Sequence, residues 1–342
     1  MQNLFIGIDF SKKKFDVTVM YRGKEEKAYS TFSNDTEGYS MMIDWVKSQA
    51  GDEPQENWLF CGENTGLYSF QLSEYLSGHG YFMWLEHAYT IKLNCGIQRR
   101  KSDKGDSSNI AEYAMRYADK ARRYYCKSKT ILGLELLFSR RELLIKMKRQ
   151  MLVHATELRS VLKRNTFAAY DYRHCMSDIN RFNKEIKDVE ERMKKEVRED
   201  TEIRENYELI TSIKGISLVN ATAFIIHTNN FHKFATSRYL ACYCGVAPFG
   251  KDSGSSVHVK PHVSRFANKT LKSLLTQAAR CAVIHDSRLR GYYLRMLEKG
   301  KADKLVINNV RNKLVHCMMA VVRTRMAYDP DYLDHKVVSN NC

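Results

Sequence analysis

Apolar residues in the first 130 positions fall in short runs, some of them alternating with polar residues and bounded by turn-forming residues. The runs at 4–9, 15–21 and 27–32 predict three consecutive strands, with a turn at 22–24. After these we expect a helix at about 37–48, a strand at 58–61, a helix at 68–76, a strand at 81–86 and a helix at 107–120. Strands in a block, then strands alternating with helices, predict a mixed sheet with helices packed on it.

Between about Ile131 and Glu205 glycine and proline nearly vanish, and apolar residues recur at helical spacing. This pattern predicts two long helices. The second set of apolar positions, from Ile179 to Met193, alternates steps of three and four, which is typical of a coiled-coil seam. The seam fits a hairpin within the chain, a coiled coil between protomers, or both.

From Leu209 onward the pattern predicts a compact, mainly helical domain. It starts with a glycine turn at 213–217, a motif that can present backbone N–H groups to phosphate, followed by an apolar helix at 219–226. We expect a loop from Gly245 to Pro261, a helix at about 269–284, and a poorly ordered tail after Asp329. The chain is thus divided into an α/β domain at 1–130, a helical coiled-coil connector at 131–205, an α-helical domain at 206–328 and a tail at 329–342.

The charge balance favours a polyanionic partner. Lysine and arginine exceed aspartate and glutamate by 55 to 39 over the 342 residues, a formal charge of +16. Residues 251–342 carry 17 basic and 7 acidic side chains, a net charge of +10. A nucleic-acid surface that releases counterions explains this excess, and a basic face that only keeps the protein soluble is the alternative.

Membrane and redox classes are disfavoured. Hydrophobic residues are 44% of the sequence, but no apolar run approaches the roughly 18 residues of a membrane span. The nine cysteines are scattered and form no CxxC pair, so reduced thiols are expected rather than a zinc or disulfide framework. These features predict a cytoplasmic protein without a membrane partner.

Four carboxylates stand where a metal site could form. Asp9 closes the first strand, Glu63 follows a later strand, and Asp103 and Asp106 are three residues apart at the start of a helix, which places both on one side of its first turn. Metal ions on carboxylates neutralise the phosphodiester and orient the nucleophile in nucleic-acid enzymes. Taken singly, Asp106 could instead be the N-cap of a helix beginning at Ser107, and Asp9 could close a turn.

With these residues the chain resembles the transposases of insertion-sequence family 110, which join a RuvC-like domain to a C-terminal transposase domain. Four short motifs carry the resemblance and span nearly the whole chain. They are Gly7-Ile8-Asp9-Phe10-Ser11-Lys12, Gly62-Glu63-Asn64-Thr65-Gly66, Lys101-Ser102-Asp103-Lys104-Gly105-Asp106, and Gly245-Val246-Ala247-Pro248 followed by Asp252-Ser253-Gly254.

The resemblance implies an RNase H-like (RuvC-like) fold for the first domain, with Asp9, Glu63, Asp103 and Asp106 as the acidic quartet and magnesium, or manganese in its place, as the ion. It implies that Ser253 attacks the backbone of donor and target DNA to give a phosphoserine link, at a composite site shared between protomers of a homo-oligomer, a dimer or tetramer. It also implies a noncoding bridge RNA that guides the recombinase to donor and target DNA.

Some positions depart from the family pattern or leave its chemistry open. Lys214 and Ser217 stand where proline and glycine are usual, Ala267 replaces a usual glycine, and Ser107 replaces a common alanine. Lys272 replaces an arginine, which removes bidentate phosphate contact because lysine acts as a point charge. Ser255 and Ser256 lie close to Ser253, and His258 and His262 are candidate bases for it by proximity alone.

Four other functions fit parts of the sequence. In a metal-dependent, junction-resolving nuclease of the RuvC type, water would replace Ser253 as nucleophile. A non-catalytic nucleic-acid-binding protein would use only the basic charge. An actin-like sugar kinase would share the 7–11 motif but needs a second glycine-rich phosphate loop, which we do not find. A tyrosine recombinase would need one of the 20 tyrosines as nucleophile, although most tyrosines serve packing.

Overall fold

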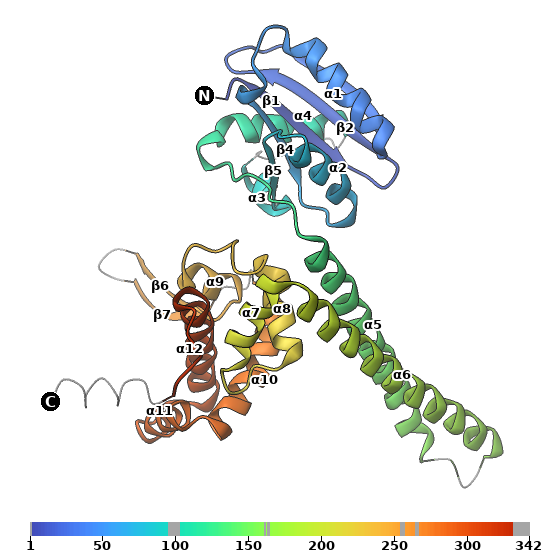
Figure 1. The fold of residues 1–342 in the computed structure, drawn as a ribbon, viewed down its shortest axis with the longest axis vertical. Coiled ribbons are helices and arrows are strands. Elements are labelled where there is room, and N and C mark those ends of the chain that lie inside the picture. The colour runs from blue at the N-terminus through green and yellow to red at the C-terminus, as the bar shows by residue number, and fades with distance from the viewer. Residues whose placement is uncertain are drawn as a thin grey trace, which may run out of the picture. The chain divides into compact units, whose positions relative to one another are not determined.

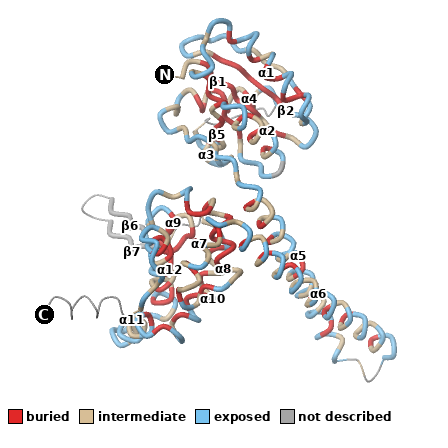
Figure 2. Tube along the Cα trace, viewed as in Figure 1, coloured by how far each residue is buried: buried red, intermediate tan, exposed pale blue. Residues whose placement is uncertain are grey.

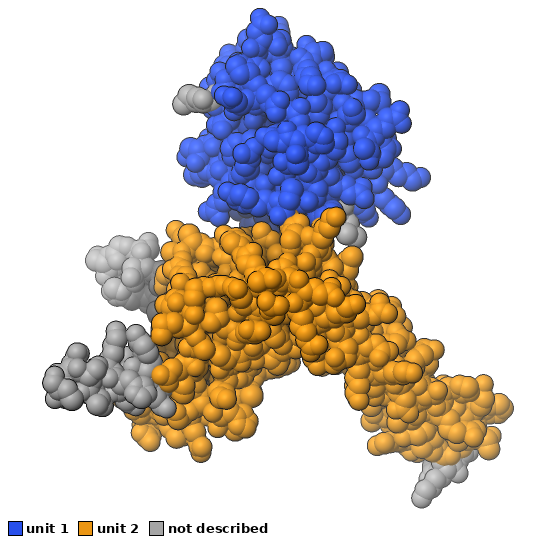
Figure 3. Space-filling view, viewed as in Figure 1, with its two compact units in different colours: residues 1–126 blue, residues 127–342 orange. Residues whose placement is uncertain are grey.

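The computed structural model describes residues 2–94, 103–160, 162, 165–253, 257–263 and 267–330. The chain forms two compact units, residues 1–126 and 127–342 (Figure 3). The first unit is a sheet with helices on both faces, and the second consists almost wholly of helices (Figure 1). Across the described ranges, none of the helices combines the length and the hydropathy that a membrane crossing requires.

Five strands form one mixed sheet in the first unit, in the order β3-β2-β1-β4-β5. The pairs β1–β2 and β2–β3 are antiparallel, whereas β1–β4 and β4–β5 are parallel. The elements are β1 (Leu4–Phe10), β2 (Lys14–Tyr21), β3 (Lys27–Ser33), α1 (Thr36–Ala50), η1 (Gln55–Asn57), β4 (Trp58–Glu63), α2 (Leu67–Gly78), β5 (Met83–Glu86), α3 (Ala88–Asn94), α4 (Asp103–Arg116) and η2 (Ala118–Lys120). The mixed sheet that the hydrophobic pattern predicts is confirmed.

Side chains of β1 alternate between two hydrophobic cores because successive residues of a strand point to opposite faces. Ile6 and Ile8 belong to the core that α1 and α2 cover, whereas Phe5 belongs to the core beneath α4. Both sets are buried (Figure 2). The central strand is therefore apolar on both faces over most of its length, and a polar side chain is tolerated only at its end.

The second unit begins with a hairpin of two long helices, α5 (Lys129–Leu158) and α6 (Thr166–Glu199), which lie side by side (Figure 1). Ser128 and Asn165 cap their N-termini by accepting backbone N–H bonds. The ion pairs Arg140–Glu185 (2.8 Å) and Arg141–Glu190 (2.7 Å) join the two helices. The hairpin within the chain, one of the arrangements that the apolar seam fits, is thus confirmed.

The remainder of the second unit packs around one large core to which the base of the hairpin also contributes. Its elements are α7 (Thr201–Thr211), α8 (Leu218–Thr228), α9 (Ser237–Tyr243), β6 (Pro248–Ser253), β7 (Val257–Val263), α10 (Lys269–His285), α11 (Ser287–Glu298) and α12 (Asp303–Thr324). The turn between α7 and α8 needs glycine: Gly215 has φ of +96°, and a Cβ there would lie 2.4 Å from the carbonyl oxygen of Ala278.

The prediction of a loop from Gly245 to Pro261 is wrong, because most of this segment forms the antiparallel hairpin β6–β7. Val257, Val259 and Val263 give β7 the alternation typical of a strand, and Gly250 and Ser253 lie within β6. Pro261 lies near a shift in the strand register, where a missing N–H is tolerated. The expected disorder of the tail concerns residues 331–342, which lie outside the described residues.

Candidate active site

Two of the predicted carboxylates lie on neighbouring strands of the sheet. Asp9 is the penultimate residue of β1, and Glu63 is the last residue of the parallel strand β4. The register pairs Ile8 with Gly62, so the next residues along both strands, Asp9 and Glu63, come level with each other. Because alternate residues share a face, both point to the α4 side of the sheet, as Phe5 does.

The N-terminus of α4 lies directly over β1. A Cβ on Gly7 would lie only 2.2 Å from the carbonyl oxygen of Ser107 and 2.3 Å from the amide nitrogen of Ala111, so only glycine permits this approach. The hydroxyl groups of Thr18 and Ser107 are hydrogen-bonded at 2.8 Å, and both residues are buried. The backbone of α4 is thereby held in place at the turn that follows its acidic residues.

Asp103 and Asp106 both lie in the first turn of α4, as their spacing predicts. The helix begins at Asp103, not at Ser107, so the alternative that Asp106 caps the helix from outside is wrong. Ser107 is buried against β2 and its hydroxyl group also donates to the carbonyl oxygen of Lys104, which extends the helical turn toward the N-terminus. Carboxylates in a first turn also interact favourably with the helix dipole.

The pKa of Asp9 is raised both by burial and by the acidic groups around it. Burial raises the pKa of Asp9 to about 6, and the negative charges of Asp106, Glu63, Asp16 and Asp103 raise it in the same direction. All four predicted carboxylates thus act on one electrostatic site, with Asp9 half-buried at its centre. A raised pKa is the usual response of a carboxyl group to burial and to neighbouring negative charges.

Sequence reasoning missed two residues of this site, Lys14 and Asp16. Lys14 Nζ lies 2.8 Å from Asp103 Oδ2 and 3.2 Å from Asp16 Oδ2. The hydrogen bond with Asp103, then that with Asp16, raises the pKa of Lys14. Asp16 lies directly opposite Asp9 in the β1–β2 pairing, a position that the short turn between the two predicted strands could have revealed.

Asp16 is a buried carboxylate whose partners come from the adjacent strand. The hydroxyl groups of Thr31 (2.7 Å) and Tyr29 (2.5 Å) donate to its Oδ1. Burial alone would raise the pKa of Asp16, but hydrogen bonds from Thr31, Tyr29 and Lys14 together hold it below its ordinary value. Asp16 is therefore ionised at neutral pH, and it keeps a permanent negative charge beside Asp9.

The quartet fits a divalent cation. Its donors are all carboxylate oxygens, the hard ligands that magnesium and manganese prefer. A cation between Asp9, Glu63 and Asp106 would relieve the repulsion that raises the pKa of Asp9. Chemically, such a centre can neutralise a phosphodiester and orient the oxygens that enter and leave at phosphorus.

Ser253 lies elsewhere in the chain, at the end of β6 in the second unit. Its main chain pairs with Val257, and the neighbouring pair joins Asp252 to His258, whereas His262 pairs with Phe249 farther along the hairpin. The register therefore places His258 nearer to Ser253 than His262. The side chains of these residues, together with Ser255 and Ser256, lie outside the described part of the structure.

A pair of cations lies in the helical part of the second unit. Burial, and then the charge of Arg311, lowers the pKa of Lys272 on α10. Arg311 on α12 is also partly buried, and its Nε has no hydrogen-bond partner among the described residues. Two partly desolvated cations close enough to repel each other are suited to a phosphate group. The sequence singled out Lys272 but not Arg311, which comes from a helix that it did not locate.

Comparison with known proteins connects both units to one class of enzyme. A family model described as a transposase of the DEDD type matches residues 6–166, and a model described as the transposase IS116/IS110/IS902 family matches residues 207–294. The DEDD type implies the use of a divalent metal and the transposase family implies DNA binding.

Similar proteins extend over nearly the whole chain. Pilin gene-inverting proteins of Moraxella bovis and Moraxella lacunata are each 24% identical over 337 residues, covering 96% of this chain and 98% of the relative. An uncharacterized 43.6 kDa protein of insertion element IS110 from Streptomyces coelicolor is 27% identical over 121 residues, covering 35% of this chain and 30% of its own length.

Proposed function

This chain belongs to the IS110 family of transposases, which are DNA recombinases, and we propose that it cuts and rejoins DNA through Ser253. In this proposal a divalent metal assists the reaction and is held by four carboxylates, Asp9, Glu63, Asp103 and Asp106. The observation that carries the proposal is the convergence of these carboxylates on Asp9, whose pKa it helps to raise to about 6. We interpret the mixed sheet beneath them as RNase H-like, supported by the match of the DEDD model to residues 6–166.

Magnesium, or manganese in its place, suits this all-oxygen set and would supply charge neutralisation at the reacting phosphate. Asp9 and Glu63, side by side on the rigid strands β1 and β4, would hold one side of the ion. Asp106, fixed by the seating of α4 over Gly7, would hold the other. Lys14 would leave Asp103 when the ion is present, while it stays beside the ionised Asp16.

In the proposed reaction the Oγ atom of Ser253 attacks a DNA phosphorus atom. The Oγ–P bond forms as the hydroxyl proton leaves, and the bond from phosphorus to one deoxyribose oxygen breaks as that oxygen takes up a proton. One phosphodiester replaces another, so the reverse attack by a second DNA end can rejoin the strand without ATP. This is the phosphoserine mechanism that the family resemblance implies.

The second unit offers a way to hold the DNA. Lys272 and Arg311 are partly buried cations that a phosphate group would neutralise. We expect them to bind the DNA backbone without regard to sequence, since phosphate contacts position the duplex and base contacts specify it. A noncoding bridge RNA would then supply the sequence choice, and protomers of a dimer or tetramer would share the carboxylates and the serine of one site.

DNA inversion is one outcome that this chemistry allows. The Moraxella relatives are named for inverting a pilin gene, and they align along nearly all of this chain. Inversion and insertion use the same steps, cutting two DNA sites and exchanging their ends. They differ only in how the sites are arranged.

The test is whether a covalent link to DNA depends on Ser253. The full chain is incubated with Mg²⁺, a plasmid that carries the DNA flanking its gene, and RNA transcribed from that DNA, and protein–DNA adducts are counted after denaturation. We expect adducts with the wild type and with Ser255→Ala, and none with Ser253→Ala. Asp9→Asn should bind the plasmid yet form no adduct.

Two results would contradict the proposal. Adducts formed by Ser253→Ala would assign the nucleophile to another residue. Strand cleavage by both the wild type and Ser253→Ala, with adducts from neither, would mean that water is the nucleophile and that the protein is a RuvC-type nuclease.

A further inference from the structure

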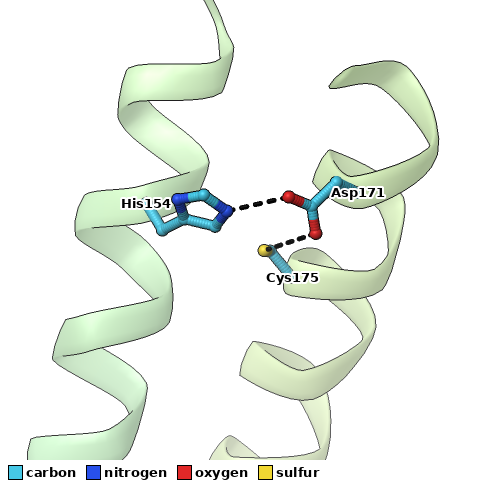
Figure 4. Close-up of side chains that lie close together, drawn as sticks. All are labelled: His154, Asp171 and Cys175. Carbon is cyan, nitrogen blue, oxygen red and sulfur yellow. Dashed lines mark hydrogen bonds and ion pairs between the residues drawn. The ribbon is translucent and has the colours of Figure 1, made fainter. Parts of the chain in front are cut away.

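Three side chains with different donor atoms meet near the tip of the α5–α6 hairpin (Figure 4). His154 comes from α5, and Asp171 and Cys175 come from α6, one helical turn apart. His154 Nε2 lies 2.8 Å from Asp171 Oδ2, and Cys175 Sγ lies 3.9 Å from Asp171 Oδ1. Within the described part of the chain, these ligand atoms form a group in which all lie within 4.8 Å of one another.

The surroundings of this group differ from those of the rest of the hairpin. The base of the hairpin shares the large core of the second unit through Phe138 and Phe182, whereas the tip has a separate small core of Ala155, Cys175 and Ile179. So small an apolar cluster stabilises a helix pair weakly. A cross-link at this point would therefore have a clear structural effect.

We propose that His154, Asp171 and Cys175 form a binding site for a thiophilic divalent transition metal, with zinc as the best match. Imidazole nitrogen, carboxylate oxygen and thiolate sulfur are the three ligand types that zinc accepts. Magnesium and calcium prefer oxygen alone, so this site differs in kind from the acidic quartet. Two ligands at positions i and i+4 of one helix face the same side and can share an ion.

The distances suit a tetrahedral centre after small side-chain movements. Zinc bonds of about 2.0 Å to nitrogen and oxygen and about 2.3 Å to sulfur place neighbouring ligand atoms about 3.3–3.5 Å apart. The observed 2.8 Å and 3.9 Å lie on either side of that range. The side chains of His154 and Asp171 are 47% and 48% exposed, so they can rotate to admit an ion without disturbing the fold.

The sulfur atom is what distinguishes the site from an ordinary ion pair. His154 and Asp171 alone would make a surface hydrogen bond, which contributes little to stability. Cys175, however, is only 4% exposed, and its sulfur faces the second oxygen of Asp171. Three protein ligands leave a fourth position for water or for a donor from another molecule.

Binding should release a proton and clamp the hairpin. Burial, and then the charges of Asp171 and Asp178, raises the pKa of the Cys175 thiol, so the thiol is protonated before the metal arrives. The metal displaces this proton as the sulfur–metal bond forms. One ion would then join α5 to α6 at the end of the hairpin that lies beyond the main core.

The experiment uses the chelator-treated full chain and Co²⁺, which replaces zinc and gives an absorption band when bound to thiolate. We expect this band in the wild type and in Cys281→Ser, a control that removes an exposed thiol of the same unit. Cys175→Ser should lack the band. His154→Ala, at a half-exposed position, should bind Zn²⁺ at least about 100-fold more weakly in competition with a zinc dye, the upper range for loss of even an outer-shell partner.

A further control separates this site from the quartet. Asp9→Asn should keep the band and the zinc affinity, because its side chain belongs to the other unit. Absence of the band from the wild type, or its persistence in Cys175→Ser, would overturn the proposal. So would unchanged zinc affinity in His154→Ala, a result that remains decisive even if Cys175→Ser fails to fold.

Discussion

Replacing Asp9 with asparagine should stabilise the metal-free first unit at neutral pH while it abolishes recombination. The carboxyl group has an ordinary pKa of 3.8 and a folded-state pKa of about 6, raised by burial and by its acidic neighbours. Its charge therefore opposes folding wherever the unfolded chain would ionise first. Asparagine keeps the shape of the side chain and removes that charge.

The size of the effect follows from the two pKa values. The interval from 3.8 to about 6 corresponds to about 3 kcal/mol if each tenfold change in the protonation equilibrium is about 1.4 kcal/mol. Because Asp9 is only partly buried, solvent screening reduces the expected gain to about 1–2 kcal/mol. The gain should be absent below about pH 4, grow between about pH 4 and 6, and stay constant above.

Tryptophan fluorescence can follow the first unit inside the full chain, because all three tryptophans, Trp45, Trp58 and Trp84, lie within residues 1–126. Urea unfolding in EDTA at about pH 4 and at about pH 8 gives the free energy of each variant. Asp44→Asn is the matched control, since that carboxylate is exposed on α1 and should show no such gain. Adding Mg²⁺ should stabilise the wild type more than Asp9→Asn, by mass action on the folded state.

An Asp9→Asn variant no more stable than the wild type at about pH 8 in EDTA would show that the charge of Asp9 does not oppose folding. An equal gain at pH 4 and pH 8 would show the same, because the gain would then come from packing and not from charge.

Two more predictions concern how the acidic site is built. Gly7→Ala should destabilise the first unit by about 1–3 kcal/mol, because the added methyl group would lie 2.2 Å from the carbonyl oxygen of Ser107. Unfolding monitored by tryptophan fluorescence measures this loss of stability. The control Gly78→Ala, whose methyl group would enter open space, should lose less stability. Lys14→Gln should tighten Mn²⁺ binding several-fold in titration calorimetry, because the ammonium group of Lys14 competes with the metal for Asp103. Weaker Mn²⁺ binding by this variant would show that Lys14 supports metal binding instead.

The sequence by itself located the five strands and the helices α1 and α2 of the first unit, although not α3 or the start of α4, and it supplied the candidates for the chemistry. Short apolar runs bounded by turn-forming residues are a local property, so the strands that carry Asp9 and Glu63 near their ends could be located from them. The spacing of Asp103 and Asp106 fixed their common side of a helix for the same reason. Ser253, in contrast, was selected by family resemblance and stays a prediction.

Local patterns failed where one segment depends on another. The β6–β7 hairpin was missed because the glycine, proline and serine residues of this segment favoured a loop, whereas the pairing of two strands distant in local pattern stabilises them together. Helix α4 starts earlier than expected because Ser107 is buried against Thr18, a contact 89 residues distant in the chain.

Only the tertiary structure decided which charges meet. The parallel pairing of β1 with β4 brings Asp9 level with Glu63, and the pairing of β1 with β2 adds Asp16, although no spacing along the chain encodes these neighbours. The hairpin brings His154 to Asp171 in the same way. Sequence determines what each residue can do because that chemistry is intrinsic, but electrostatics and coordination depend on distances that only the packed fold establishes.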